Sequence, residues 1–153
     1  MEDEQRALID DVLSNQEVGD DVLLRFERLG DTAFDEICRR LMSQSLSPSQ
    51  QVLALRGLVR LTRQFCAMRK EELLELAVER LKSDNPFVRS GAVSTTIWTS
   101  IMLQENPSLA SKAENRPGAN PSLRERVKAA VGHAVRLGVD EEQAEFAREY
   151  LAH

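Results

Sequence analysis

The sequence has few of the residues that build metal centres and disulfide frameworks. It contains two cysteines and two histidines in 153 residues, with no CxxC motif and no Cys/His cluster. Cys38 and Cys66 fall at apolar positions of helical patterns, so we expect no zinc site, no disulfide framework and no other cofactor. Free cysteines are typical of a reducing compartment. The N-terminus is acidic and lacks the apolar stretch of a signal peptide, so we expect a cytoplasmic protein.

Aromatic residues and clusters of β-branched residues are also scarce. Aromatics make up 5% of the chain, whereas Leu, Ala, Glu and Arg recur in long runs. This composition favours helices over strands, and the length suits one domain, so we expect a single all-α domain over residues 1–153. The most apolar stretch, residues 86–103, carries six Ser or Thr residues and Arg89, which argues against a membrane span.

Motifs of known catalytic chemistry are absent from the sequence. There is no nucleophile triad, phosphate-binding P-loop or Gly-rich nucleotide loop, and no Ser or Thr is spaced near a general base. The net charge of −5 argues against a general nucleic-acid binder. We therefore expect a protein that is not an enzyme.

Residues 86–103 form the stretch around which the chain is organised. Asn85 is a favourable N-cap, and Pro86 suits the first helical position, where its missing N–H costs nothing. Apolar side chains fall almost all the way round the helix, and Arg89 is its one charge. We expect this helix to be central and buried on most sides.

Apolar residues at three- and four-residue spacing predict seven further helices. Their expected positions are 3–14, 20–29, 31–42, 48–66, 69–82, 121–137 and a last helix capped by Asp140. Proline and glycine signals indicate a loop over 104–120, and a short helical turn at 107–114 is compatible with the same pattern.

An internal repeat relates three of these helices. Pro48, Pro86 and Pro121 each begin the pattern Pro-x-x-[Gln/Arg]-x-x-[Ala/Val], at spacings of 38 and 35 residues. The segments Arg40-Leu41-Met-Ser43 and Arg80-Leu81-Lys-Ser83 also correspond. The repeating unit is therefore a helical hairpin, which must stack on its neighbours to bury its apolar face.

The pattern Asp84-x-Pro86-x-Val88-Arg89-x-x-Ala92 resembles the start of the second helix in a HEAT repeat, and residues 31–103 cover two such hairpins. The resemblance implies a short right-handed α-solenoid in which Asp84 and Arg89 belong to a structural ladder of side chains. The family consists mostly of interaction scaffolds, and a few relatives bind nucleic acid or excise damaged bases. In such stacks the second helices, here 48–66, 86–103 and 121–137, line the concave surface.

The repeat register predicts which side chains face that concave surface. The expected partner-binding residues are Arg56, Arg60, Arg63, Ser94, Trp98, Ile101, His133 and Arg136. Trp98 would then lie between Arg60 and His133, as an apolar anchor with a basic rim. Two alternatives stay open: the terminal helices or the 104–120 loop cover Trp98, and His133 is a flanking polar residue rather than an acid–base group.

Charge is unevenly distributed along the chain. Residues 37–70 contain seven basic residues and no acid, whereas residues 1–36 contain twelve acids and three bases. Either this basic block forms a patch for an acidic partner, or acids elsewhere in the chain neutralise it within the fold.

These observations predict a non-enzymatic protein–protein interaction module, either an adaptor or an inhibitor or immunity-type partner, that holds a protein or peptide on its concave face. The alternative is a HEAT-like nucleic-acid-binding or base-excision protein, similar to a DNA glycosylase, that uses the basic block and Trp98. The expected groove lacks the carboxylate that base excision needs, which favours the first hypothesis. No membrane partner is expected, and the oligomeric state is left open.

Overall fold

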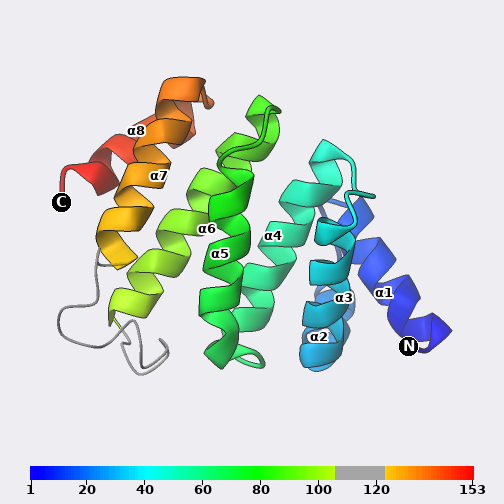
Figure 1. Cartoon of the computed structure of the whole chain (residues 1–153). Helices are drawn as coiled ribbons and strands as arrows, with labels where there is room; N and C mark the ends of the chain where they lie inside the picture. Colours follow the sequence, from blue (N-terminus) through cyan, green and yellow to red (C-terminus); the bar gives the residue numbers. More distant parts are fainter. Residues whose placement is uncertain (106–122) are drawn as a thin grey trace. The chain divides into compact units, whose positions relative to one another are not determined.

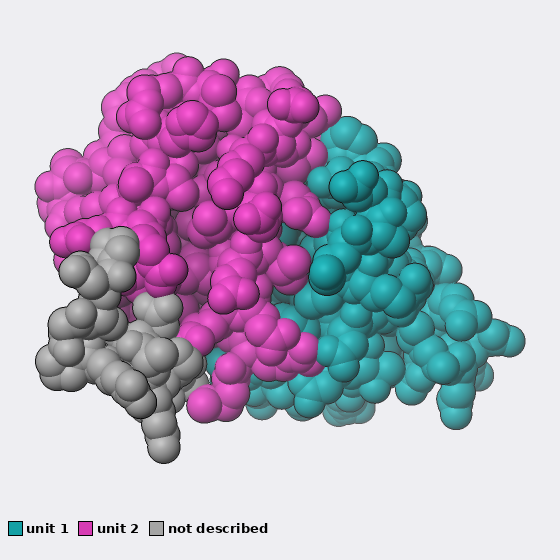
Figure 2. All heavy atoms as spheres, viewed as in Figure 1, with its two compact units in different colours: residues 1–67 teal, residues 68–153 magenta. Residues whose placement is uncertain are grey.

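The computed structural model describes residues 1–105 and 123–153. Over these residues the chain is helical and contains no strand, which confirms the all-α prediction. The short turn expected at 107–114 lies outside them, as does the expected loop from residue 106 onward. The chain divides into two compact units, residues 1–67 and 68–153, and each is described by itself (Figure 2). No described helix combines the length and apolarity needed to cross a membrane.

Unit 1 consists of α1 (Asp3–Ser14), α2 (Asp20–Arg28), α3 (Asp31–Met42) and α4 (Pro48–Thr62) (Figure 1). Local signals set the start of α4, because Ser47 and Gln50 form a reciprocal capping box in front of Pro48. The helix ends at Thr62, one turn earlier than the expected end at Cys66. The backbone N–H of Cys66 donates to the Leu61 carbonyl, five residues earlier, and so does not continue the four-residue hydrogen bonding of the helix.

The core of unit 1 is built on the fully buried rings of Phe26 and Phe34. Gly57 on α4 lies close to the first of them: a Cβ at this position would be 3.4 Å from the Phe26 ring and 3.6 Å from Ile37 Cδ1, which is ordinary van der Waals contact. A side chain larger than alanine at position 57 would therefore displace the ring from the interface between α2 and α4.

Unit 2 contains the short 3₁₀ helix η1 (Ala67–Arg69, which begins at the boundary), α5 (Lys70–Arg80), α6 (Pro86–Glu105), α7 (Leu123–Leu137) and α8 (Glu141–Leu151). Helix α6 contacts the three other α-helices of the unit and is buried on most sides, so its expected central place is confirmed. The Asn85 side chain accepts hydrogen bonds from the N–H groups of Phe87 and Val88, as its N-cap role predicts.

The third hairpin differs from the one that the repeat register predicts. Residues 121–137 were expected to act as a second helix, equivalent to 86–103. Instead, α7 pairs with α8 through a three-residue turn, so α7 is the first helix of this pair (Figure 1). Proline at a first helical position marks the start of a helix and carries no information about its place in a hairpin, which explains the error.

Candidate interaction surface

One side of α6 stays open to solvent. Its members are spaced by three or four residues and therefore lie on one side of the helix: Phe87, Gly91, Ser94, Trp98 and Ile101. Phe87 is 49% exposed and Trp98 is 54% exposed, while the other three are half-buried. None of the five is charged, and we call this set the α6 stripe.

The one basic residue of α6 points away from the stripe and is buried. The Arg89 guanidinium donates hydrogen bonds to the carbonyl oxygens of Ser83 (2.7 Å), Gly138 (2.9 Å) and Leu137 (3.3 Å). The last two lie at the C-terminus of α7, where carbonyls have no partner within their helix and carry partial negative charge. Arg89 thus caps a neighbouring helix, and within the described residues it forms no pair with Asp84, which corrects the expected ladder.

Two hydroxyl contacts hold α8 against α6. The backbone N–H of Asp140 donates to Ser90 Oγ at 2.9 Å, just before α8 begins. Near the other end of the helix, the Ser100 and Tyr150 hydroxyls lie 3.0 Å apart in a buried hydrogen bond. These contacts fix the position of α8 along α6 and therefore the neighbours of the α6 stripe.

Helix α8 brings a second aromatic residue to Trp98. The ring centroids of Trp98 and Phe146 are 6.5 Å apart with the planes tilted by 45°, an ordinary geometry for an aromatic pair. Phe146 contacts Trp98, which nevertheless stays more than half exposed. Phe146 was not among the predicted site residues, although its position one turn before the buried Tyr150 indicates the edge of the buried face of α8.

The other predicted site residues fall into two groups that belong to different units. On α4 of unit 1 and its C-cap, Arg56 and Arg63 are exposed and Arg60 is half-buried. In unit 2, Ser94 and Ile101 lie beside Trp98 on the α6 stripe, whereas His133 and Arg136 are exposed on α7. A role for the eight residues in partner binding stays a prediction.

Acidic side chains pair with much of the basic block. Salt bridges join Arg39 to Glu36, Arg40 to Asp10 (2.6 Å) and to Glu36 (3.2 Å), Arg60 to Glu27 (3.0 Å) and Arg69 to Glu72 (2.9 Å). The two arginines beside Glu36, above all Arg39, lower the pKa of that carboxyl to about 2. Neutralisation within the fold is therefore confirmed for these four arginines, while Arg56 and Arg63 have no acidic partner among the described residues.

The exposed side of α8 carries the opposite charge. Glu142 and Glu149 lie one turn before and one turn after Phe146, on the side that faces solvent. Neither carboxylate has an ion-pair partner in the part of the chain that the structure describes, whereas the neighbouring Glu141 lies 3.5 Å from Arg148. The Trp98–Phe146 pair thus has an acidic border on α8.

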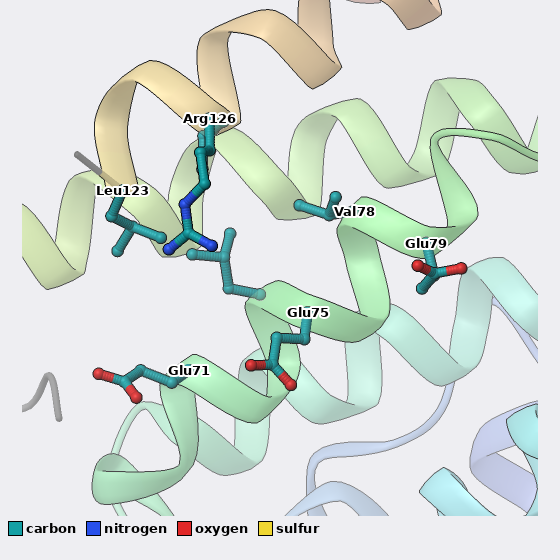
Figure 3. Close-up of a pocket in the computed structure, with 8 residues that line it drawn as sticks. Glu71, Glu75, Val78, Glu79, Leu123 and Arg126 are labelled. Atoms are coloured by element: carbon teal, nitrogen blue, oxygen red, sulfur yellow. The ribbon is translucent and has the colours of Figure 1, made fainter. Parts of the chain in front are cut away.

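A groove of about 380 Å³ lies between α5 and α7 (Figure 3). Leu74 and Val127 form its buried floor, and three carboxylates one turn apart line its α5 wall: Glu71, Glu75 and Glu79. From α7, Arg126 extends toward α5 across the groove. No group of His, Cys, Asp or Glu in residues 1–105 and 123–153 is arranged to hold a metal ion, so these carboxylates do not form a metal site.

No protein-family model, curated protein or solved structure matches the chain.

Proposed function

We propose that the chain is a non-enzymatic protein-interaction module, an adaptor or inhibitor-type protein, that binds its partner along the α6 stripe. One observation carries the proposal: Trp98 is 54% exposed on a helix side without charge. Exposed aromatic residues on an apolar surface mark binding sites, and Trp is enriched among the residues that dominate binding energy.

The same proposal includes the HEAT-like α-solenoid as the arrangement of the helices. The hairpins α5–α6 and α7–α8 in unit 2 support it, as does the correspondence between residues 40–43 and 80–83. Under this proposal, the hydrogen bonds from Arg89 to the end of α7 stand in the place of the side-chain ladder of the family.

Capture of partners from a native lysate tests the proposal. Three baits are compared by quantitative mass spectrometry: the wild type, Trp98→Ala and the control Leu24→Ala, which removes an apolar side chain of similar exposure (45%) from α2. A partner of the α6 stripe is retained by the wild type and the control and lost by Trp98→Ala. Against the purified partner, the Trp98 variant should lose about 2 kcal/mol or more, roughly thirtyfold in Kd.

Thermal unfolding of the same variants separates binding from folding. Because Trp98 is half exposed, its removal should destabilise the protein by less than the ~3–5 kcal/mol of a fully buried aromatic. If every captured protein binds Trp98→Ala as tightly as the wild type, the proposal is wrong.

A titration with labelled duplex and single-stranded DNA tests the nucleic-acid alternative. Only Arg56 and Arg63 of the described part of the basic block remain exposed without an acidic partner, so we expect weak binding. Micromolar or tighter binding that falls steeply with salt would overturn the proposal in favour of a nucleic-acid function.

A further inference from the structure

We infer that the α6 stripe binds an amphipathic helix whose polar flank is basic; this inference rests on the proposed function. Phe87 and Ile101 are fourteen residues apart, so the stripe is about 21 Å long at 1.5 Å per residue. That length matches roughly four turns of a partner helix. Such a helix would place apolar side chains at i, i+3, i+4 and i+7 along the stripe.

The middle of the stripe suits close approach by a helix. Gly91 and Ser94 are small and lie between the exposed rings of Phe87 and Trp98. Bulky side chains of a partner can therefore pack near the α6 backbone, between the rings of Phe87 and Trp98. Phe146 extends the apolar area on the side of α8.

Charge complementarity determines the sign of the charge expected on the partner helix. The stripe itself is uncharged, and Glu142 and Glu149 lie beside Phe146 as exposed carboxylates without an ion-pair partner among the described residues. Lysine or arginine on the flank of the partner helix would meet them, while an acidic flank would be repelled. Because such rim pairs stay in contact with water, they contribute to selectivity and to the association rate more than to affinity.

The basic block of residues 37–70 left an acidic partner open as one alternative. The salt bridges of Arg39, Arg40, Arg60 and Arg69 weaken that argument, since the charge of these side chains is already matched within the fold. The unmatched carboxylates of α8 border the apolar surface beside Phe146, and they favour a basic segment.

The single tryptophan makes the inference directly measurable. The probes are two synthetic 18-residue helical peptides without tryptophan, with leucine on one face and either lysine or glutamate on the other. Trp98 is the only tryptophan of the chain and is exposed, so a peptide that covers it shifts its emission to shorter wavelength. At low salt we expect the lysine peptide to saturate this shift at a concentration at least about tenfold lower than the glutamate peptide.

Charge reversal on α8 tests whether Glu142 and Glu149 cause the preference for the lysine peptide. The double variant Glu142→Lys/Glu149→Lys should weaken the lysine peptide about tenfold and strengthen the glutamate peptide. The charge-matched control Glu75→Lys/Glu79→Lys, which changes the α5 wall of the groove, should leave both titrations of Trp98 close to the wild type. Equal effects of the two double variants would show that net charge alone attracts the peptide, and the inference would be wrong.

Two further outcomes separate this inference from the proposed function. If both peptides shift Trp98 equally, the basic partner is refuted and the α6 stripe is retained as an apolar binding surface. If neither peptide shifts Trp98 although a captured partner requires it, the helical segment is refuted and the interaction module stands. The proposed function itself fails only in the capture experiment with Trp98→Ala.

Discussion

The helix–helix contacts described above differ in chemistry between the two units. In unit 1, ion pairs join separate helices: Arg40 on α3 binds Asp10 on α1, and Arg60 on α4 binds Glu27 on α2. In unit 2, Arg89 binds backbone carbonyls at the end of α7, and Ser100 binds the Tyr150 hydroxyl. The first set consists of charged pairs that are exposed or partly buried, and the second set is partly or fully buried and involves no carboxylate.

This difference affects both stability and binding. Carboxylates titrate and are screened by salt, so the contacts of unit 1 should weaken in acid and at high ionic strength. Carbonyl and hydroxyl groups do not titrate over the usual pH range, and they carry no net charge for salt to screen. Because the contacts of α6 with α7 and α8 use no charged residue of the α6 stripe, this side of the helix remains uncharged and open to a partner.

The largest expected effect comes from removing the charged member of the unit 2 contacts. Arg89→Ala leaves the carbonyls of Ser83, Leu137 and Gly138 without their buried donor, which should cost about 2–3 kcal/mol. Chemical denaturation followed by Trp98 fluorescence measures the loss in unit 2. Arg136→Ala, an exposed change on α7, is the control and should stay within about 0.5 kcal/mol. An unchanged midpoint for Arg89→Ala would mean that water replaces its hydrogen bonds without cost.

Glu36 should account for part of the acid sensitivity of unit 1. Its pKa is lowered from 4.5 to about 2, so its stabilising contribution is complete above pH 4.5 and is lost as the pH falls toward 2. After a discount for the exposure of Arg39, we expect Glu36→Gln to cost about 1–2 kcal/mol at neutral pH and to flatten the decline in acid. Hydrogen exchange of unit 1 amides from pH 7 to 3 measures the cost at neutral pH and the decline of stability in acid. A decline in acid as steep as in the wild type would exclude this role of Glu36.

The buried hydroxyl pair of unit 2 should show a smaller effect that does not depend on pH. Tyr150→Phe removes one partner from Ser100, which keeps its hydrogen bond with the Gln104 side chain, and should cost about 1 kcal/mol. In a double-mutant cycle with Ser100→Ala, the two losses should be less than additive. Ser94→Ala, on the exposed stripe, serves as the control with no expected loss. Full additivity would show that the two hydroxyls do not interact.

The smallest effects distinguish paired from unpaired arginines. Arg60→Ala should cost about 0.5–1 kcal/mol through its pair with Glu27, and the loss should shrink at 1 M salt. Arg63→Ala, three residues later and exposed, should be neutral at any salt concentration. Thermal unfolding at low and high salt measures both variants. Equal losses would mean that the ion pair of Arg60 contributes nothing.

Local signals in the sequence determined the helices and the central place of α6. Asn85 with Pro86 and Ser47 with Pro48 begin α6 and α4 where expected, because a cap acts through hydrogen bonds within one turn of its own residue. The scarcity of charge in residues 86–103 likewise predicted a helix that is buried on most sides, since apolar side chains drive burial wherever they lie.

The tertiary structure alone decided which distant residues meet. The family resemblance implied that Arg89 belongs to a ladder with Asp84, but the end of α7, about fifty residues away, supplies its acceptors. It left the basic block either exposed or neutralised, and the packing of α2 and α1 against α4 and α3 brought Glu27 and Asp10 to their arginines. Phe146 lies beside Trp98 because α8 packs against α6 on the side that carries Trp98. Contacts of this kind depend on how whole helices pack, which no spacing within one helix encodes.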